Sequence, residues 1–290
     1  RRVGEPFARA AGCPRRGDPV ACLRALPVEE VLETQTRRLV VTSVLRSGVD
    51  GLLLWSPVVD GEFLVGVPIG EAFASGYDVP AMIGTTTGEG VIFGYGGGAR
   101  MGFMEMSVAA QVLLGRQAGD LVMRHYSPGF GRDQRPAWMQ MFTDIVFRCP
   151  SLGLALAGSA PTYVYEFEHL PDQGLYRVPA CAELSCHSQD VPYVFGVASG
   201  PRSFTPAERE LSGFVQGLWG AFAHDPHGLE GTDLGGGSTW PRYQASDHLV
   251  LALDLEPYVR EADLSGCDVA AEVGLIRGIV DRLPELPDLP

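Results

Sequence analysis

The sequence predicts an α/β fold in which short strands alternate with helices along the chain. Strands are predicted where β-branched and aromatic residues run together, as in residues 162–167 and 248–254. Helices are predicted where apolar residues recur at a spacing of three or four, as in residues 136–147. This alternation is typical of a layered sheet with helices packed on its faces.

The elements of the first half follow in chain order. Residues 5–33 read as short helices around a cysteine-bounded loop, and residues 52–61 read as extended chain that ends in an Asp-Gly turn. Residues 78–84 read as a short buried strand, and residues 85–90 (TTTGEG) form the loop that leaves it. Residues 105–117 are predicted to be helical.

The second half contains the clearest helix start of the chain. Thr205 can cap a helix, with Pro206 in its first position and Glu208 in its third. A buriable run at residues 191–195 is interpreted as a strand, and residues 269–283 as the last helix.

Charge and hydropathy exclude several classes of partner. The formal net charge of −13 argues against a nucleic acid or an anionic membrane surface, since both attract basic patches. No apolar run reaches the roughly 18 to 20 residues that a membrane span needs. The first residue is Arg1 rather than methionine, so we expect the natural start upstream and any signal peptide outside these 290 residues.

Six cysteines form an even set, for which 15 pairings exist in principle. Cys13 and Cys22 flank one short loop, and Cys181 and Cys186 flank another, so two local disulfides are plausible, leaving Cys149 and Cys267 for a long-range bridge. This set favours an oxidising, extracytoplasmic compartment. The alternative is six reduced thiols in a cytosolic enzyme.

Two loop residues are candidates for acid–base chemistry. Histidine is the commonest general base because its pKa lies near physiological pH, and His187 stands in a short loop directly after Cys186. Glu89 lies between Gly88 and Gly90 in the loop after a strand, where a carboxylate can orient a histidine. Taken alone, a loop histidine is more often structural, and a loop glutamate more often solvated.

A nucleophile for this pair is missing from the sequence. The nucleophile elbow of α/β hydrolases reads G-x-S-x-G, because its strained turn tolerates only small flanking residues. No serine of the chain stands in this motif, and neither Ser159 nor Ser238 has the full pair of flanking glycines. An oxyanion-hole glycine cluster of the His-Gly-Gly type is also missing.

Two other motifs suggest functions that differ from acid–base chemistry by Glu89 and His187. Residues 94–99 fit G-x-G-x-x-A with Asp120 further on, the outline of a dinucleotide fingerprint, but the apolar segment before them is only three residues long. His224 and His227 flank Asp225-Pro226 and could suggest a metal site; a turn that ends the preceding helix is the simpler interpretation.

Several stretches together resemble the C-terminal half of the type-B carboxylesterase/cholinesterase family of α/β hydrolases. The loop from Cys13 to Cys22 resembles the disulfide loop that follows the nucleophile elbow in that family. The similar stretches occur in family order at 55–61 (WSPVVDG), 79–90 (VPAMIGTTTGEG), 143–150 (TDIVFRCP), 163–169 (YVYEFEH), 187–196 (HSQDVPYVFG) and 240–243 (WPRY).

The resemblance implies roles for individual residues. Glu89 matches the acid of the family's catalytic triad, and His187 matches its base. Asp190 matches an acidic position three residues after the histidine, and we expect it to stabilise the position of His187 indirectly. The pairs Cys13–Cys22 and Cys149–Cys267 match family disulfides, and Cys181–Cys186 matches a local pair of some members. Two positions depart from the family: Ser188 replaces a glycine, and Gly88 replaces an acidic or polar residue.

The resemblance leads to an explicit expectation. Residues 1–290 form the C-terminal part of a single carboxylesterase domain whose nucleophile-bearing N-terminal half is absent, so the isolated chain is expected neither to fold stably nor to hydrolyse esters. The complete protein would hydrolyse a small-molecule ester without metal or organic cofactor and outside the cytoplasm. The alternatives are a non-catalytic interaction module related to cholinesterases, or half of a split esterase that a separate chain completes.

Overall fold

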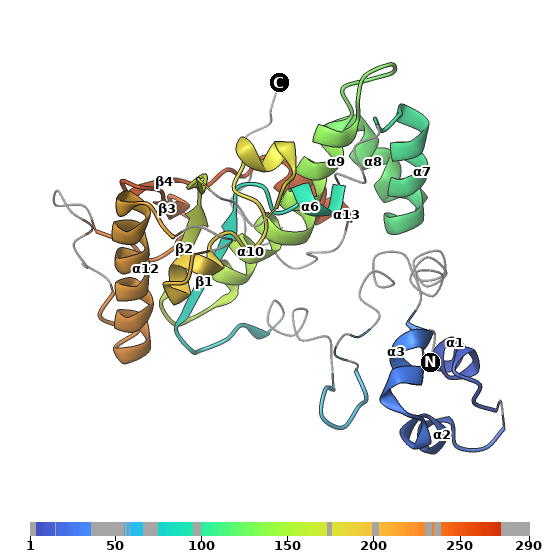
Figure 1. Cartoon of the computed structure of the whole chain (residues 1–290). Coiled ribbons are helices and arrows are strands. Elements are labelled where there is room, and N and C mark those ends of the chain that lie inside the picture. The colour runs from blue at the N-terminus through green and yellow to red at the C-terminus, as the bar shows by residue number, and fades with distance from the viewer. Residues whose placement is uncertain are drawn as a thin grey trace. The chain divides into compact units, whose positions relative to one another are not determined.

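The computed structural model describes residues 4–14, 16–35, 55, 57, 59–65, 75–94, 100–172, 176–198, 203–229, 234 and 239–273 (Figure 1). The chain divides into two compact units. The first contains Arg1–Asp60 and Met104–Arg124, and the second contains Gly61–Phe103 and His125–Pro290. In the ranges given above, no helix combines the length and apolar character that crossing a bilayer requires.

The first unit is helical. Asp18 caps its second helix by accepting hydrogen bonds from the backbone N–H groups of Val20 and Ala21, at 2.9 and 3.0 Å. A disulfide joins Cys13 to Cys22 across the loop before this helix. The helices that lie wholly or mainly in this unit are α1 (Gly4–Ala10), α2 (Pro19–Ala25), α3 (Val28–Thr34), α7 (Phe103–Leu114) and α8 (Arg116–Tyr126).

The helix predicted at 105–117 is therefore divided. Gly115 has a φ of +86°, a conformation that side chains other than glycine rarely adopt, and it separates α7 from α8. The helical pieces predicted at 5–33 are confirmed as α1, α2 and α3.

The second unit is built on a four-stranded sheet in the order β1–β2–β3–β4. The first three strands are parallel, and β4 is antiparallel to β3. Strand β2 has the predicted bounds, and β4 was not anticipated. The strands are β1 (Ala81–Thr86), β2 (Thr162–Phe167), β3 (Leu249–Leu253) and β4 (Tyr258–Glu261).

Helices connect the strands of this sheet. The helix predicted at 136–147 continues to residue 157, because a π-helical turn joins two α-helical segments without a break. The helical elements of this unit are α6 (Val91–Gly94), α9 (Arg135–Phe142), the π-helix η3 (Thr143–Arg148), α10 (Cys149–Ala157), the 3₁₀-helix η4 (Pro179–Ala182), α11 (Val191–Phe195), α12 (Pro206–His224) and α13 (Cys267–Val273).

Helix α12 lies beside the sheet and closes its main core (Figure 1). Its capping box is formed as predicted: the Thr205 hydroxyl accepts from the Glu208 N–H, and the Glu208 carboxylate accepts from the Thr205 N–H. The Trp240 indole donates to the Val164 carbonyl at 3.1 Å, so this buried ring also satisfies its polar atom. The fully buried members of the core include Tyr163, Phe167, Leu211, Val215, Leu251 and Leu253.

The prediction of a strand at residues 191–195 is wrong. These residues form the short helix α11, with Pro192 in its first turn and Gly196 at its C-cap with a φ of +67°. Proline near the start and glycine just past the end are helix signals, and they outweigh the β-branched composition of the run.

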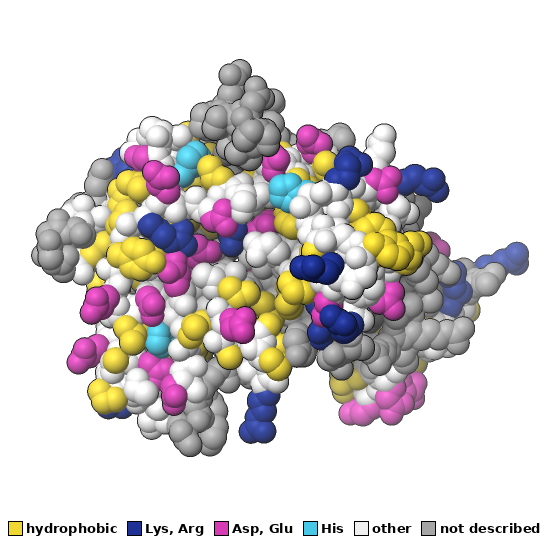
Figure 2. Space-filling model, turned by 90° about the horizontal axis from the view of Figure 1, so that it is seen from above, with side chains coloured by type: hydrophobic (Ala, Val, Ile, Leu, Met, Phe, Trp, Pro, Cys, Tyr) yellow, Lys and Arg dark blue, Asp and Glu magenta, His cyan; other side chains and the backbone are white. Residues whose placement is uncertain are grey.

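Two other predictions extend outside the described residues. They concern residues 52–54, 56 and 58 of the extended segment and residues 274–283 of the last helix, of which α13 is the described part. On the face shown in Figure 2, the described acidic and basic side chains are interspersed, and the basic ones form no continuous patch.

Candidate active site

Glu89 lies in the tight turn that leaves β1. The residue is buried, and its Oε1 accepts a hydrogen bond from the backbone N–H of Thr86 at 2.7 Å. The next backbone N–H, of Gly90, donates to the Thr143 hydroxyl at 2.9 Å, which ties the turn to η3. The carboxylate is therefore held rigidly, with its second oxygen left for another partner.

The glycines on either side of Glu89 are required by close packing. A Cβ on Gly90 would lie 2.0 Å from the Met139 carbonyl oxygen, which no small adjustment relieves. A Cβ on Gly88 would lie 2.8 Å from the Leu184 Cβ. A larger residue at position 88 would therefore separate the Glu89 turn from the segment that carries His187.

A short parallel bridge between Gly88 and Cys186 brings His187 to Glu89. The Gly88 N–H donates to the Ser185 carbonyl at 2.7 Å, and the Ser185 N–H donates to the Thr87 hydroxyl at 2.9 Å. The disulfide Cys181–Cys186 closes the loop on the other side.

His187 and Glu89, 98 positions apart in sequence, form a hydrogen bond between Nδ1 of the imidazole and Oε2 of the carboxylate. The Glu89 side chain is 7% exposed and the His187 side chain 35% exposed. A buried acid that binds Nδ1 fixes the orientation of the ring. The second ring nitrogen, Nε2, then remains available to accept or donate a proton.

Aromatic rings surround the imidazole. The ring centroids of Phe93 and Phe147 lie 5.5 and 5.3 Å from that of His187. Phe93 comes from α6 directly after the Glu89 turn, and Phe147 comes from η3. Neither ring was singled out from the sequence, although Phe147 belongs to one of the stretches that carry the family resemblance.

Asp190 makes no hydrogen bond to the His187 imidazole in the described part of the chain. Its carboxylate accepts a hydrogen bond from the Tyr165 hydroxyl at 3.1 Å. Burial, together with the negative charges of Asp190 and Glu89, raises the pKa of Tyr165, so the phenol remains a donor. Any support that Asp190 gives to His187 would act through the backbone of the turn or through Tyr165.

A third member of a catalytic triad is not found beside the pair. In the part of the chain that the structure describes, no serine hydroxyl is hydrogen-bonded to His187. A hollow of about 690 Å³ in the same unit is lined by Arg100, Tyr126 and Gln140 among others, and neither Glu89 nor His187 lines it.

The competing motifs gain no support from the structure. The segment before the glycine-rich run is the helix α6 rather than a strand, and residues 95–99 lie outside the described ranges. His224 ends α12, and Asp225 is its C-cap. Over the residues described, no group of three His, Cys, Asp or Glu side chains is placed to hold a metal ion.

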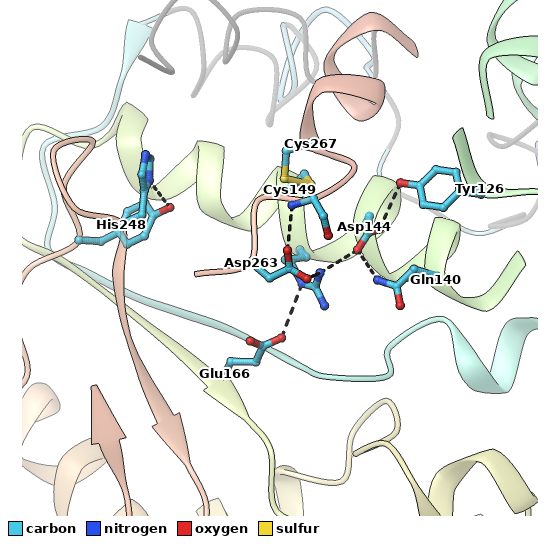
Figure 3. Close-up of a disulfide and its surroundings, with 11 residues drawn as sticks. Tyr126, Gln140, Asp144, Cys149, Glu166, His248, Asp263 and Cys267 are labelled. Carbon is cyan, nitrogen blue, oxygen red and sulfur yellow. Dashed lines mark hydrogen bonds and ion pairs between the residues drawn. A yellow bond between two sulfur atoms is a disulfide. The ribbon is translucent and has the colours of Figure 1, made fainter. Parts of the chain in front are cut away.

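A second acid–base cluster, not anticipated from the sequence, surrounds the disulfide Cys149–Cys267 (Figure 3). The Arg148 Nη1 donates to Asp144 at 3.0 Å and to Asp263 at 2.9 Å, and the Arg148 Nε lies 3.6 Å from Glu166. Tyr126 and Gln140 complete the hydrogen bonding of Asp144, at 3.1 and 2.8 Å.

The mixed sheet, with three parallel strands and helices between them, has the fold of the α/β hydrolases. The model of the Carboxylesterase family matches residues 1–268, and the chain belongs to this family. The solved structure of a PNB esterase superposes with a TM-score of 0.67 at 23% identity, covering 88% of this chain and 50% of that one, which supports the fold.

Curated relatives have similar sequences. An acylcarnitine hydrolase of Rattus norvegicus is 31% identical over 285 residues, 90% of this chain and 46% of the relative. The "Crystal protein" of Dictyostelium discoideum is 30% identical over 202 residues, 65% of this chain and 35% of the relative. A para-nitrobenzyl esterase of Bacillus subtilis is 28% identical over 214 residues. The chain thus spans a third to a half of the length of these proteins.

Proposed function

We propose that this chain provides the histidine and the acid of a Ser–His–Glu triad that hydrolyses carboxylic esters. The observation that carries the proposal is the hydrogen bond from the partly exposed His187 to the buried Glu89. Membership of the carboxylesterase family supports ester hydrolysis as the reaction class.

The two residues would act in sequence. A serine hydroxyl attacks the ester carbonyl while His187 Nε2 takes its proton, and the imidazolium then gives that proton to the departing alcohol. Glu89 holds the ring through Nδ1 and stabilises the imidazolium charge. Water then repeats the cycle on the acyl-enzyme and releases the acid, so the proposed reaction uses no metal or organic cofactor.

The serine of this reaction would come from outside the 290 residues, since no serine of the chain stands in G-x-S-x-G. It would lie on the same polypeptide or on a separate chain. Strand β1 pairs with β2 on one side, and no described strand pairs with its other edge. That edge is where a strand of the remaining fold would add to the sheet.

We also propose an oxidising, extracytoplasmic location. The structure pairs all six cysteines in disulfides, and such sets are rare where glutathione keeps thiols reduced. A mass-spectrometric count of free thiols in the protein from its native source checks this proposal: six free thiols would overturn it.

The experiment that tests the function compares two proteins. The isolated 290-residue chain is expected to show no hydrolysis of a p-nitrophenyl ester, whereas the full-length product of its gene, or the chain co-purified with a serine-bearing partner, is expected to hydrolyse the ester. His187→Ala should abolish that activity. Hydrolysis by the isolated chain that His187→Ala removes would overturn both its inactivity and the location of the serine outside the 290 residues, but it would support His187 as the base.

The alternative of a non-catalytic interaction module makes a different prediction. In that case the full-length product carries no serine in the nucleophile motif and does not hydrolyse any ester. The retained Glu89–His187 hydrogen bond favours the enzyme, because an interaction module does not need an acid–histidine pair.

A further inference from the structure

Gln189 occupies an unusual position two residues after His187. Its side chain is only 1% exposed, and its Oε1 accepts a hydrogen bond from the backbone N–H of Cys186. The Gln189 backbone N–H donates to the Cys186 carbonyl at 3.0 Å. Backbone and side chain of Gln189 therefore both close the turn that contains His187.

The two ends of this turn are fixed independently. Cys186 is bound to Cys181 by a disulfide and bridged to Gly88, next to Glu89. On the other side, Asp190 precedes α11 and accepts a hydrogen bond from Tyr165. Gln189 lies between these two fixed points and is hydrogen-bonded back to Cys186. His187 lies in the turn that these hydrogen bonds close.

The Gln189 amide is not explained by packing alone. Its Nε2 is buried and has no hydrogen-bond partner among the residues described. A buried donor without a partner destabilises a fold by about 1–3 kcal/mol, which an apolar residue of the same shape avoids. What the amide provides instead is the acceptor for the Cys186 N–H, one residue before His187.

We propose that Gln189 is a positioning residue that holds the His187 turn so that Nδ1 stays directed at Glu89. This inference rests on the proposed function for its catalytic consequence, but the geometry that it predicts can be measured without any ester. Loss of the Oε1 acceptor would release the Cys186 N–H and let the imidazole move relative to the carboxylate.

The test replaces Gln189 in two ways. Gln189→Met keeps the length and volume of the side chain but removes the acceptor, and Gln189→Glu keeps an acceptor oxygen. The first readout is the proton NMR signal of His187 Nδ1–H in the full-length gene product labelled with ¹⁵N-histidine, assigned by its loss in His187→Ala. We expect the signal in the wild type and in Gln189→Glu, and its loss in Gln189→Met.

The second readout is ester hydrolysis by the full-length gene product. Because displacement of a catalytic group by about 1 Å can lower rates about 100-fold, we expect Gln189→Met to lower kcat by about 10- to 100-fold with little change in KM. Gln189→Glu should recover most of this loss.

Gln134 supplies a matched control. It is a fully buried glutamine of the same unit. Its Oε1 accepts a hydrogen bond from the Ser127 hydroxyl, and its Nε2 donates to the carbonyls of Gly129 and Arg132. Gln134→Met should lower the unfolding midpoint at least as much as Gln189→Met, yet keep the His187 signal and kcat.

Each outcome decides the proposal. A His187 signal and kcat unchanged in Gln189→Met, equal losses in Gln134→Met, or a wild-type full-length protein without the signal would each overturn it. If the signal behaves as expected while no protein hydrolyses esters, the positioning role stands and the esterase function fails.

Discussion

His187 and Arg148 are two basic residues of the same unit that differ in how completely acids surround them. Each is next in sequence to a disulfide cysteine, His187 after Cys186 and Arg148 before Cys149. Arg148 is 8% exposed and reaches three carboxylates. The His187 side chain is 35% exposed and, among the described residues, pairs with one acid, Glu89.

We propose that this difference separates a structural cluster around Arg148 from a reactive one around His187. Three carboxylates lie within ion-pair distance of the buried Arg148 guanidinium, which favours a structural role. His187 is held by a single buried acid, and the rest of its ring lies among Phe93 and Phe147 with part of it exposed. An accessible base that a single acid holds is compatible with the acid–base role that we propose for His187.

The largest expected effect is on the reactive cluster. Glu89→Gln keeps the shape of the acid but removes its charge, so the imidazole loses its orienting partner and its stabilisation as imidazolium. We expect kcat for ester hydrolysis by the full-length protein to fall by on the order of 10³- to 10⁴-fold, measured by steady-state kinetics.

The control for this variant is Glu208→Gln. Glu208 is equally buried, at 5% exposure, but it serves the capping box of α12. Its replacement should reduce stability and leave kcat of the folded protein near the wild-type value. Equal losses of kcat in the two variants would mean that Glu89 is structural.

The next effect concerns the structural cluster. Arg148→Met leaves Asp144 buried without its cation, whereas Glu166 keeps its pair with Arg260. Breaking a buried ion pair in this way destabilises a protein by about 3–5 kcal/mol. Urea unfolding of the protein measures this loss. Arg135→Met removes the more exposed pair with Asp133 and should change the free energy of unfolding by less than about 1 kcal/mol. Similar values for the two variants would contradict the contrast between the sites.

A smaller effect depends on pH. Burial raises the pKa of Asp144 from 3.8 to about 6, although Arg148 and the donors Gln140 and Tyr126 oppose the shift. The folded state therefore binds more protons than the unfolded state between these values, and this contribution to stability is present below pH 3.8 and lost as the pH rises through about 6.

Asp144→Asn removes this titration. From pH 4 to pH 7 the wild type should lose up to about 3 kcal/mol of unfolding free energy relative to the variant. Denaturant melts of both proteins at the two pH values give the comparison. A constant difference between them would show that the carboxyl group is not perturbed in the folded state.

The smallest effect lies next to His187. Ser188 has a φ of +66°, in the left-handed region that a residue with a Cβ adopts at a cost of about 1 kcal/mol. Ser188→Gly removes this strain and restores the residue usual in the family, so it should stabilise the protein by up to about 1 kcal/mol without lowering kcat. A lower thermal midpoint would contradict the account of strain.

Local sequence was sufficient for elements with strong local signals. The strand at Thr162–Phe167 and the capped start of α12 at Thr205 were predicted correctly, because alternation, propensity and capping act over a few residues. The error at α11 came from weighting composition above Pro192 and Gly196. The separation of α7 from α8 likewise depends on Gly115, since a glycine with a positive φ ends a helix.

Residue types in their order along the chain were enough to predict the alternation of strands and helices, the family, and Glu89 and His187 as candidates. The folded chain was needed to see that these two side chains meet, that Gly88 and Gly90 permit their approach, and that Arg148 is enclosed. Those facts depend on the pairing of segments about 100 residues apart, which sheet register and core packing set and which no local pattern encodes.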